Sequence, residues 1–373
     1  MKIQFDPSAD AAGKLFSDPL EIIRADTPDE VEAAFAAIIR AQEAGHWLAG
    51  YLSYELGYCL SRKLAPLMPE ARELPLILLG VFAACEEAAP APAPQDAPAL
   101  RFADAPPGFD SYQPAFQRVH DYLASGDTYQ VNLTFPLELA CDGAPEALYA
   151  ALAARQPTEF GAYVDLGGPV LLSRSPELFF QVDAEGWIET RPMKGTAARG
   201  ATPEEDHAAR DELAASEKNQ AENLMIVDLM RNDLSRISEV GSVKVPKLFE
   251  IETYETVHQM TSTVRAKLIP GTTLPDILRA IFPCGSVTGA PKIRAMEIIH
   301  ELEPAPRGVY CGAIGWVSPE AEMRFNVPIR TLTCHSADRI TLNVGGGLVY
   351  DSTAEAEYRE ALLKARFTGV ADL

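Results

Sequence analysis

The sequence predicts an α+β fold built largely from antiparallel strands. Short strand-like runs between residues 160 and 191 are separated by two turn signals, Gly167-Gly168-Pro169 and Asp183-Ala184-Glu185-Gly186, which is the pattern of consecutive hairpins. Elsewhere, strand-like runs occur in groups with helices between them. This favours α+β over a doubly wound sheet, in which strands and helices alternate strictly. With 373 residues, 47% of them hydrophobic, the chain can bury a substantial core as one large domain or two small ones.

The first predicted elements form a short N-terminal part. Thr27-Pro28-Asp29-Glu30 combines an N-cap, a proline in the first turn and a capping-box glutamate, so we expect a helix from there to Gly45. Strand-like runs follow at residues 47–54 and 76–82. Residues 86–108 are rich in Ala and Pro and poor in bulky apolar side chains, which predicts a linker. The predicted organisation is a shorter region, residues 1–108, packed with the remainder, residues 109–373, as one globular unit.

Beyond residue 108 the helix and strand signals come in groups. Ser111 is placed to cap a helix that ends at Gly126, and a strand candidate covers residues 129–133. Thr202-Pro203-Glu204-Glu205 repeats the cap pattern and opens a helix that we expect to continue toward Asp233. The remaining predicted elements are strands at residues 253–268, 309–317, 324–333 and 340–344, with short helices between them, and a last helix from residue 353 to about 367.

The charge and the cysteine content exclude several classes of partner. The formal net charge is -21, whereas nucleic acids and anionic membrane surfaces are bound through basic faces. The six cysteines show neither CxxC nor Cys/His clustering, so we expect reduced thiols rather than disulfides or structural zinc. The N-terminus lacks an apolar signal core, and the longest apolar stretch, residues 74–84, is too short to span a bilayer. These features predict a cytoplasmic protein that binds neither nucleic acid nor membrane.

Charged side chains on two predicted helices are candidate metal ligands. Glu357, Glu360 and Lys364 are spaced three and four residues apart, so they share one face of the last helix. On most acidic helices such a stripe is an exposed, salt-bridged face. Glu222 favours a functional interpretation, because it lies on another helix in an increasingly apolar segment, where an unpaired charge is costly. Carboxylates that converge from two helices suit Mg²⁺, which takes oxygen ligands and keeps several waters.

Two glycine-rich runs are candidate ligand-binding loops. Residues 285–291, Gly-Ser-Val-Thr-Gly-Ala-Pro, precede a predicted helix, and free backbone N–H groups at a helix start attract anions. The run is not a Walker A sequence, because Lys292 lacks the required glycine before it and a Ser or Thr after it. Gly345-Gly346-Gly347 has an ordinary alternative as a bulge or tight bend in a strand. Arg330 lies in a strand-like run, and its planar guanidinium suits a carboxylate.

Glu177 and Lys194 are the candidate acid and nucleophile. Glu177 stands between Ser175-Pro176 and an apolar run, a setting that raises the pKa of a carboxyl group and keeps it protonated. Lys194 stands between a strand-like segment and a Gly-Thr turn, where burial would lower the pKa of its amine and make it nucleophilic. Taken singly, a residue of either kind is more often exposed on the surface.

Several ordered runs together resemble the chorismate-utilising enzymes over about residues 111–367. The runs include residues 126–133, 192–196, 222–234, 285–292 and 310–315. The resemblance implies large antiparallel sheets packed as a sandwich with flanking helices. Pro192-Met193-Lys194-Gly195-Thr196 resembles the Pro-Ile-Lys-Gly-Thr of the aminodeoxychorismate synthase component I branch, whereas anthranilate and isochorismate synthases carry Ala at the lysine position. Gln130 stands where isochorismate and salicylate synthases carry a lysine that activates water.

This resemblance implies amination of chorismate at C4 to give 4-amino-4-deoxychorismate, the precursor of 4-aminobenzoate in folate biosynthesis. Lys194 would add to C2 of the ring, and Glu177 would protonate the departing C4 hydroxyl before ammonia attacks C4; Gln130 completes the implied catalytic set. Mg²⁺ would be held by Glu222 and Glu360, with Glu357 close by. The implied substrate-binding residues are Gly195, Thr196, Ser286, Tyr310, Arg330, Gly345, Gly346, Gly347 and Lys364.

The sequence also bears on the source of ammonia and on the alternative functions. No cysteine has a Gly-x-Cys-x-Gly setting, so ammonia is expected from a glutamine amidotransferase subunit, component II, or from solution. The nearest alternative is anthranilate synthase component I, and another is an inactive chorismate-binding subunit that would have lost Glu177, Lys194 or the metal carboxylates. Related synthases place a histidine where this chain has Gln259, beside His258. The N-terminal part is shorter than usual, so the sequence leaves open an amino-acid effector site, and also the oligomeric state and any release of pyruvate.

Overall fold

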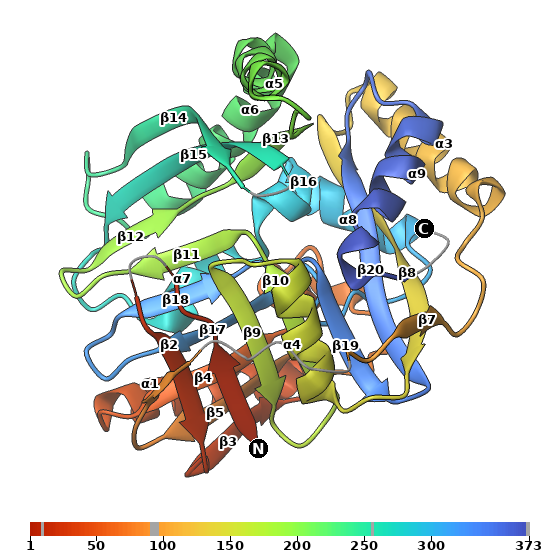
Figure 1. The fold of residues 1–373 in the computed structure, drawn as a ribbon. Helices are drawn as coiled ribbons and strands as arrows, with labels where there is room; N and C mark the ends of the chain where they lie inside the picture. The colour runs from red at the N-terminus through yellow and green to blue at the C-terminus, as the bar shows by residue number, and fades with distance from the viewer. Residues whose placement is uncertain (9–10, 90–96, 255–256, 371–373) are drawn as a thin grey trace.

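A computed structural model describes residues 1–8, 11–89, 97–254 and 257–370. Within these residues the chain forms two ten-stranded sheets, with helices around their periphery (Figure 1). Every pair of neighbouring strands in both sheets is antiparallel. The predicted α+β class with large antiparallel sheets is confirmed.

The two sheets are named here A and B. Sheet A runs in the spatial order β16 (Gly289–Ala290), β8 (Gln130–Cys141), β20 (Arg339–Leu348), β19 (Thr331–Ser336), β10 (Val170–Ser175), β9 (Phe160–Asp165), β1 (Lys2–Phe5), β2 (Gly13–Ser17) and β6 (Glu86–Ala88), with β7 (Leu100–Phe102) also on β8. Sheet B runs β13 (Met193–Ala198), β15 (Val257–Lys267), β12 (Trp187–Thr190), β11 (Leu178–Val182), β18 (Met323–Asn326), β17 (Ala313–Val317), β4 (Trp47–Leu52), β5 (Ile77–Phe82) and β3 (Glu21–Ala25), with β14 (Lys244–Thr253) also on β15.

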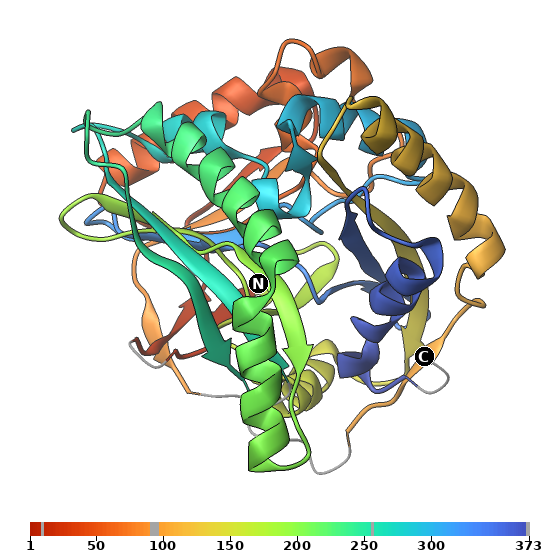
Figure 2. The same cartoon turned by 90° about the horizontal axis from the view of Figure 1, so that it is seen from above.

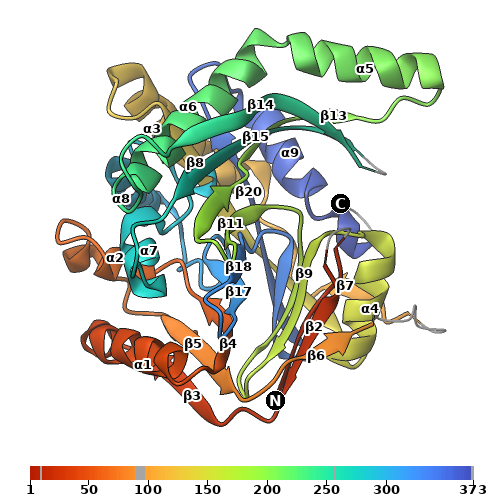
Figure 3. The same cartoon turned by 90° about the vertical axis from the view of Figure 1, so that its left-hand side faces the viewer.

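The helices pack on both sheets. They are α1 (Val31–Glu43), α2 (Leu56–Cys59), α3 (Phe109–Ser125), α4 (Pro145–Arg155), α5 (Pro203–Ala215), α6 (Glu217–Ser235), α7 (Leu274–Ile281), α8 (Lys292–Leu302) and α9 (Ala354–Leu363), with 3-10 turns η1 (Pro28–Glu30), η2 (Ala65–Leu67), η3 (Gly285–Val287) and η4 (Arg366–Thr368). Helix α9 packs on β20 of sheet A and on helix α3. Helix α6 packs on β13 and β15 of sheet B. Figure 3 shows α5 extending outward beyond the sheets. None of the helices in the described part of the chain is long and apolar enough to cross a bilayer.

N-terminal strands take part in both sheets. β1 pairs with β9 of the later chain, and β4 pairs with β17. The stretch predicted as a linker, residues 86–108, begins in a strand and contains a second one, since β6 pairs with β2 and β7 pairs with β8. Its residues 90–96 lie outside the described residues.

Several predicted boundaries are wrong. The helix expected from residue 202 toward 233 is two helices, because Ser216 adopts an extended conformation and caps α6 by accepting a hydrogen bond from the amide of Asn219. The strand expected at 324–333 is β18 and β19 in different sheets, separated by a segment with Pro328 and with Arg330 at φ 51°. The strand expected at 309–317 begins only at Ala313. Residues 255–256 of the strand expected at 253–268 lie outside the described residues.

Candidate active site

The predicted site residues gather where β13 of sheet B faces β8 and β20 of sheet A. Figure 2 shows β13 and α6 on one side of this region and β20 and α9 on the other. β13 supplies Lys194, β8 begins with Gln130, and β20 contains Gly347. Glu222 lies on α6, and Glu360 lies on α9. Residues far apart in sequence are therefore brought to one place by the meeting of two sheets.

Lys194 is a partly buried lysine in this region. Burial lowers the pKa of its amine, and the charge of Lys364 lowers it further, while the carboxylates of Glu222 and Glu177 oppose the shift. The net direction is downward. A neutral amine is therefore more available here than on an exposed lysine, which is the property that a nucleophile needs.

Glu177 is the buried acid. It lies directly before β11, and its side chain is 4% exposed. Burial raises its pKa from the usual 4.5 to about 7, although the Ser286 hydroxyl, the charge of Lys194 and the amide of Met193 all favour the ionised form. Ser286 Oγ donates to Glu177 Oε1 at 2.6 Å. The carboxyl group is therefore poised to hold a proton near neutral pH, as a general acid must.

Gln130 and Gly347 define one wall of the site. The Gln130 side chain is fully buried, yet neither amide atom has a hydrogen-bond partner among the described residues. Such a group is costly unless a ligand or water satisfies it. A methyl group added to Gly347 would come within 2.6 Å of Gln130 Nε2 and 2.9 Å of Lys194 Nζ. Glycine is needed here because the amide and the amine occupy the space of a side chain.

The bulge or bend considered for the triple glycine is wrong. Gly345, Gly346 and Gly347 pair in regular register with Thr134, Leu133 and Asn132 of β8. Their contacts explain the composition instead. A methyl group on Gly345 would meet the carbonyl of Leu133 at 2.2 Å, and one on Gly346 would meet Glu357 Oε2 at 3.0 Å.

The predicted metal ligands form an acidic corner between α6 and α9. Burial raises the pKa of Glu222 and of Glu357, and Glu360 raises both further by its negative charge. Glu357 accepts a hydrogen bond from Ser352 Oγ at 2.6 Å. Lys364 lies 2.9 Å from Glu360 and holds the pKa of that carboxyl group below its usual value, although burial alone would raise it.

This corner fits a divalent cation. Glutamates that destabilise each other's charged forms are stabilised by a cation between them. Within the described residues, no group of three or more acidic, histidine or cysteine side chains is placed to hold a metal ion by itself. Mg²⁺ does not require one, because it commonly uses one or two carboxylates together with waters and substrate oxygens. Glu222 and Glu360 are the pair that would serve this purpose, with Glu357 as a third carboxylate whose pKa Glu360 also raises.

Lys218 is a charged neighbour that sequence reasoning missed. It lies one turn before Glu222 on α6, 4.0 Å from that carboxylate, and its side chain is 58% exposed. Its positive charge also lowers the pKa of Glu357 and Glu360 across the gap to α9. The spacing of four residues on one helix could have pointed to it.

Arg330 has no anionic partner among the residues that the structure describes. It lies between β18 and β19, and its backbone carbonyl accepts a hydrogen bond from the amide of Arg174. Among the described residues, its guanidinium has neither a carboxylate nor a hydrogen-bond acceptor, and burial lowers its pKa. A partly buried guanidinium of this kind is available for a ligand carboxylate. Tyr310, by contrast, is buried against Cys311 just before β17.

The remaining predicted residues, Gly195, Thr196 and Lys364, lie at the edge of the candidate site. Gly195 has φ 94° and packs against Asn219, while Thr196 is exposed. Thr196 and Asn219 line an open cleft of about 620 Å³ between β13 and α5. Lys364 Nζ also donates to the carbonyl of Gly345 at 2.8 Å, so its charge is fixed over the glycine strand.

The side chain of His258 connects β15 to β14 and to α5 through hydrogen bonds at its two ring nitrogens. Its ring nitrogens lie 3.0 Å from Thr253 Oγ1 and 2.9 Å from Asp206 Oδ1. Arg199 forms two further hydrogen bonds to the carboxylate of Asp206, near the start of α5. Gln259 lies opposite Thr196 in the strand register and therefore shares the Thr196 face of the sheet. Gln259, rather than the adjacent His258, therefore has its side chain on the same face of the sheet as the predicted site residue Thr196.

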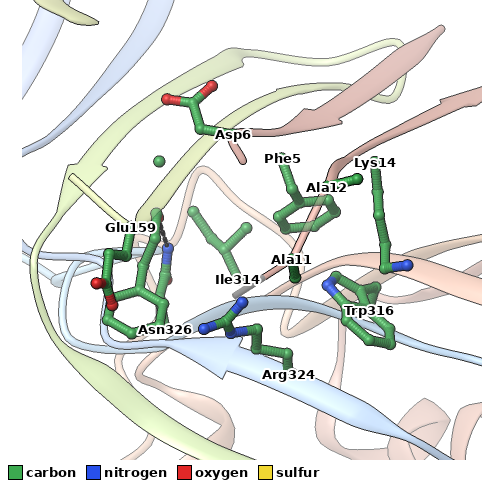
Figure 4. A pocket seen from close by; sticks show the side chains of 12 residues that line it. Phe5, Asp6, Ala11, Ala12, Lys14, Glu159, Ile314, Trp316, Arg324 and Asn326 are labelled. Atoms are coloured by element: carbon green, nitrogen blue, oxygen red, sulfur yellow. Dashed lines mark hydrogen bonds between the residues drawn. The ribbon is translucent and has the colours of Figure 1, made fainter. Parts of the chain in front are cut away.

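A separate small cavity lies between the N-terminal strands and β17. Its volume is about 30 Å³, and its walls include Phe5, Lys14, Trp316 and Asn326 (Figure 4). None of the predicted site residues lines it.

Two further contacts fix the frame of the site. Lys292 Nζ donates to Asp233 Oδ2 at 2.6 Å and so ties the start of α8 to the end of α6. Ser262 donates to Asn223 Oδ1 at 2.5 Å and ties α6 to β15. Sequence reasoning missed both, because their spacing along the chain gives no signal.

The family follows from comparison with known proteins. A family model described as chorismate binding enzyme matches residues 5–368. The chain belongs to this family. Curated relatives of the chain include the aminodeoxychorismate synthase of Streptomyces pristinaespiralis, 45% identical over 69% of this chain, and aminodeoxychorismate synthase component 1 of Klebsiella aerogenes, 46% identical over 68%. The matched segments are 36% and 56% of those proteins, so the chain spans between about a third and just over half of their length.

Solved structures of family members share the fold. Anthranilate synthase component I from Streptococcus pneumoniae superposes with a TM-score of 0.80 at 27% identity, covering 97% of this chain and 93% of the other. The menaquinone-specific isochorismate synthase of Escherichia coli superposes with a TM-score of 0.74 at 16% identity, covering 99% of this chain and 87% of the other. The second likeness concerns the fold alone.

Proposed function

We propose that this chain converts chorismate and ammonia into 4-amino-4-deoxychorismate, the precursor of 4-aminobenzoate in folate biosynthesis. The observation that carries the proposal is the buried amine of Lys194, with its lowered pKa, in a site that also holds the protonatable Glu177. Similarity to proteins named aminodeoxychorismate synthase supports the same reaction. Anthranilate synthase component I, the alternative, is disfavoured by the lysine at position 194.

The reaction proceeds in two displacement steps. The neutral amine of Lys194 bonds to C2 of the ring, the double bond shifts, and the C4 hydroxyl leaves as water with the proton of Glu177. Ammonia then attacks C4, the double bond shifts back, and the C2–N bond breaks with its electron pair returning to Lys194. The new C4 ammonium returns one proton to the Glu177 carboxylate. Chorismate and ammonia thereby give the amino product and water, and both residues are restored.

The other residues bind and orient the substrate. The guanidinium of Arg330 takes a substrate carboxylate, because no protein anion occupies it among the described residues. The amide of Gln130 has two unused hydrogen-bonding atoms that face the same space as Lys194 Nζ. Glu222 and Glu360 would hold Mg²⁺, with Glu357 beside them, and the ion would supply charge neutralisation and orientation for the second carboxylate.

The source of ammonia is proposed to be a second subunit. Relatives named component 1 are similar to this chain, and such a name implies a separate component II. The six cysteines are all free, and the buried Cys141, Cys284, Cys311 and Cys334 have no access to glutamine. We therefore assign the amidotransferase chemistry to a glutamine amidotransferase partner.

One assay tests the proposed function. The purified chain is incubated with chorismate, MgCl₂ and either ammonium or glutamine, and the products are separated and identified by mass. The expected product is 4-amino-4-deoxychorismate with ammonium and none with glutamine alone. Anthranilate and pyruvate in equal amounts would instead assign anthranilate synthase activity. Recovery of unchanged chorismate under every condition would assign a binding subunit.

A further inference from the structure

Three buried side chains form a chain of contacts that ends on the acid. Cys284 Sγ lies 3.1 Å from Ser286 Oγ, and Ser286 Oγ lies 2.6 Å from Glu177 Oε1. All three side chains are at most 4% exposed. Ser286 was predicted to bind substrate, and nothing in the sequence pattern connected Cys284 with Glu177. The structure instead gives the single hydroxyl hydrogen of Ser286 a protein acceptor.

The loop that carries Cys284 and Ser286 is held on several sides. Gly285 packs so closely on α6 that an added methyl group would lie 2.4 Å from a side-chain carbon of Leu229. Arg307 donates to the carbonyl of Val287 at 2.9 Å. Thr288 Oγ1 donates to the carbonyl of Cys284 at 2.7 Å, and the amide of Asn132 donates to the carbonyl of Thr288. The hydroxyl of Ser286 therefore has little freedom to leave Glu177.

A chain of this kind can run in either of two directions. In one direction the thiol donates to Ser286, which donates to Glu177 Oε1. In the other direction a proton on Oε1 is donated to Ser286, which donates to the sulfur. The two arrangements place the carboxyl proton on different oxygens, because an Oε1 that accepts from Ser286 leaves Oε2 to carry it.

The thiol favours the first direction. Burial raises the pKa of Cys284 to about 12, so the group keeps its proton at every pH at which the protein works. The amide and the hydroxyl of Ser286 oppose this shift, but burial outweighs them. Because Ser286 has one hydroxyl hydrogen and donates it to Glu177 Oε1, the hydrogen between Cys284 Sγ and Ser286 Oγ is the one that the thiol retains.

We propose that Cys284 and Ser286 are positioning residues that direct the catalytic proton of Glu177 away from Oε1, the oxygen that accepts from Ser286, and onto Oε2. The proton moves from Oε2 to the departing hydroxyl, and the Ser286 hydrogen bond then stabilises the carboxylate that remains. The recipient of the proton rests on the proposed function, whereas the contacts themselves do not. The charged and titratable groups that act on this carboxyl group or on its neighbours include Lys194, Cys311 and Lys292.

The test is a titration that requires no turnover. The infrared band of protonated carboxyl groups is followed between pH 5 and 9 in the intact chain, and the Glu177 component is assigned by its loss in Glu177→Gln. Glu55, whose pKa burial also raises to about 7, provides an internal reference in the same spectra. The variants are Ser286→Ala, Cys284→Ala and Cys284→Ser. Cys334→Ala is the matched control, because Cys334 is equally buried but lies on β19 away from the chain of contacts.

Each variant has a stated expectation. Ser286→Ala should move the Glu177 midpoint upward by about one to two pH units, since a hydrogen bond to the charged form is lost. Cys284→Ala should move it upward by about half a unit, since thiols are weak donors, and Cys284→Ser should restore it. The Glu55 midpoint, and every midpoint in Cys334→Ala, should stay in place.

The kinetics add a second measurement. Ser286→Ala should lower kcat by about tenfold and leave KM for chorismate within about twofold, because the hydroxyl acts through Glu177. An unmoved Glu177 midpoint in Ser286→Ala, or a raised KM at constant kcat, would overturn the proposal and return Ser286 to substrate binding. A midpoint in Cys284→Ala identical to that of the wild type would overturn the role of the thiol. The two midpoint results can be obtained even if the amination itself is not observed, because the titration uses the enzyme without substrate.

Discussion

Lys194 and Glu222 are each other's strongest charge partner, although they lie on different elements, β13 and α6. Burial is the larger influence on both groups: it lowers the pKa of the amine and raises the pKa of the carboxyl group. Each charge then partly offsets the effect of burial on the other. The lysine remains shifted toward the neutral form that nucleophilic attack requires. The proposed nucleophile and a proposed metal ligand are thus electrostatically linked.

Replacement of Arg330 tests the assigned carboxylate contact. Arg330→Lys keeps the charge but loses the planar fork, so KM for chorismate should rise about tenfold or more while kcat changes little. Lysine adopts the positive φ of this position with the same difficulty as arginine, so the backbone is matched. Steady-state kinetics at fixed ammonium measure both constants. An unchanged KM would show that the unpartnered guanidinium does not meet the substrate.

Loss of one acidic ligand should weaken Mg²⁺ binding. Glu222→Gln and Glu360→Gln should each raise the dissociation constant about tenfold or more, measured directly with Mn²⁺ by electron paramagnetic resonance and by the Mg²⁺ dependence of turnover. Glu355→Gln is the matched control, because Glu355 lies on the same helix with its side chain 69% exposed. Equal metal affinity in the wild type and all three variants would show that these glutamates do not bind the ion. Full turnover in excess chelator would show that the reaction does not need Mg²⁺.

Glu55 should make the stability of the fold depend on pH. Burial raises its pKa from 4.5 to about 7, although it accepts hydrogen bonds from the amides of Arg307 and Gly308. Because the folded pKa is the higher one, the stabilisation is fully present below pH 4.5 and is lost as pH rises through about 7. Glu55→Gln keeps an acceptor oxygen and removes the titration.

Denaturant unfolding at pH 5 and pH 8 measures this effect. The wild type should lose about 2 to 3 kcal/mol more than Glu55→Gln over that interval. Glu177 titrates in both proteins and cancels from the comparison. A difference between the two proteins that stays constant with pH would contradict the buried, protonatable state of Glu55.

The sequence predicts the class of the fold, and it proposes site residues, because turn signals and motif runs are local. The segment around Arg330 shows that the local sequence pattern can give the wrong strand boundaries. Its neighbours read as one strand, but Pro328 and a left-handed backbone divide the run between two sheets. The triple glycine had a bend as an alternative interpretation and is a regular strand; at Gly347 the cause of the glycine is the approach of Gln130 and Lys194 from other elements. The contact between Ser286 and Glu177 joins residues 109 positions apart, which no pattern along the chain reports.

The covalent role of Lys194 is the central claim, and intact-protein mass spectrometry tests it most directly. Wild-type chain incubated with chorismate and MgCl₂, and rigorously freed of ammonia, should gain the mass of chorismate less one water, and ammonium should then discharge the adduct. Lys194→Ala should gain no mass and should lose most of its kcat with little change in KM. Glu177→Gln should also form no adduct, because the C4 hydroxyl cannot leave without the proton. If the wild type never gains this mass and Lys194→Ala keeps a normal kcat, the covalent mechanism is wrong.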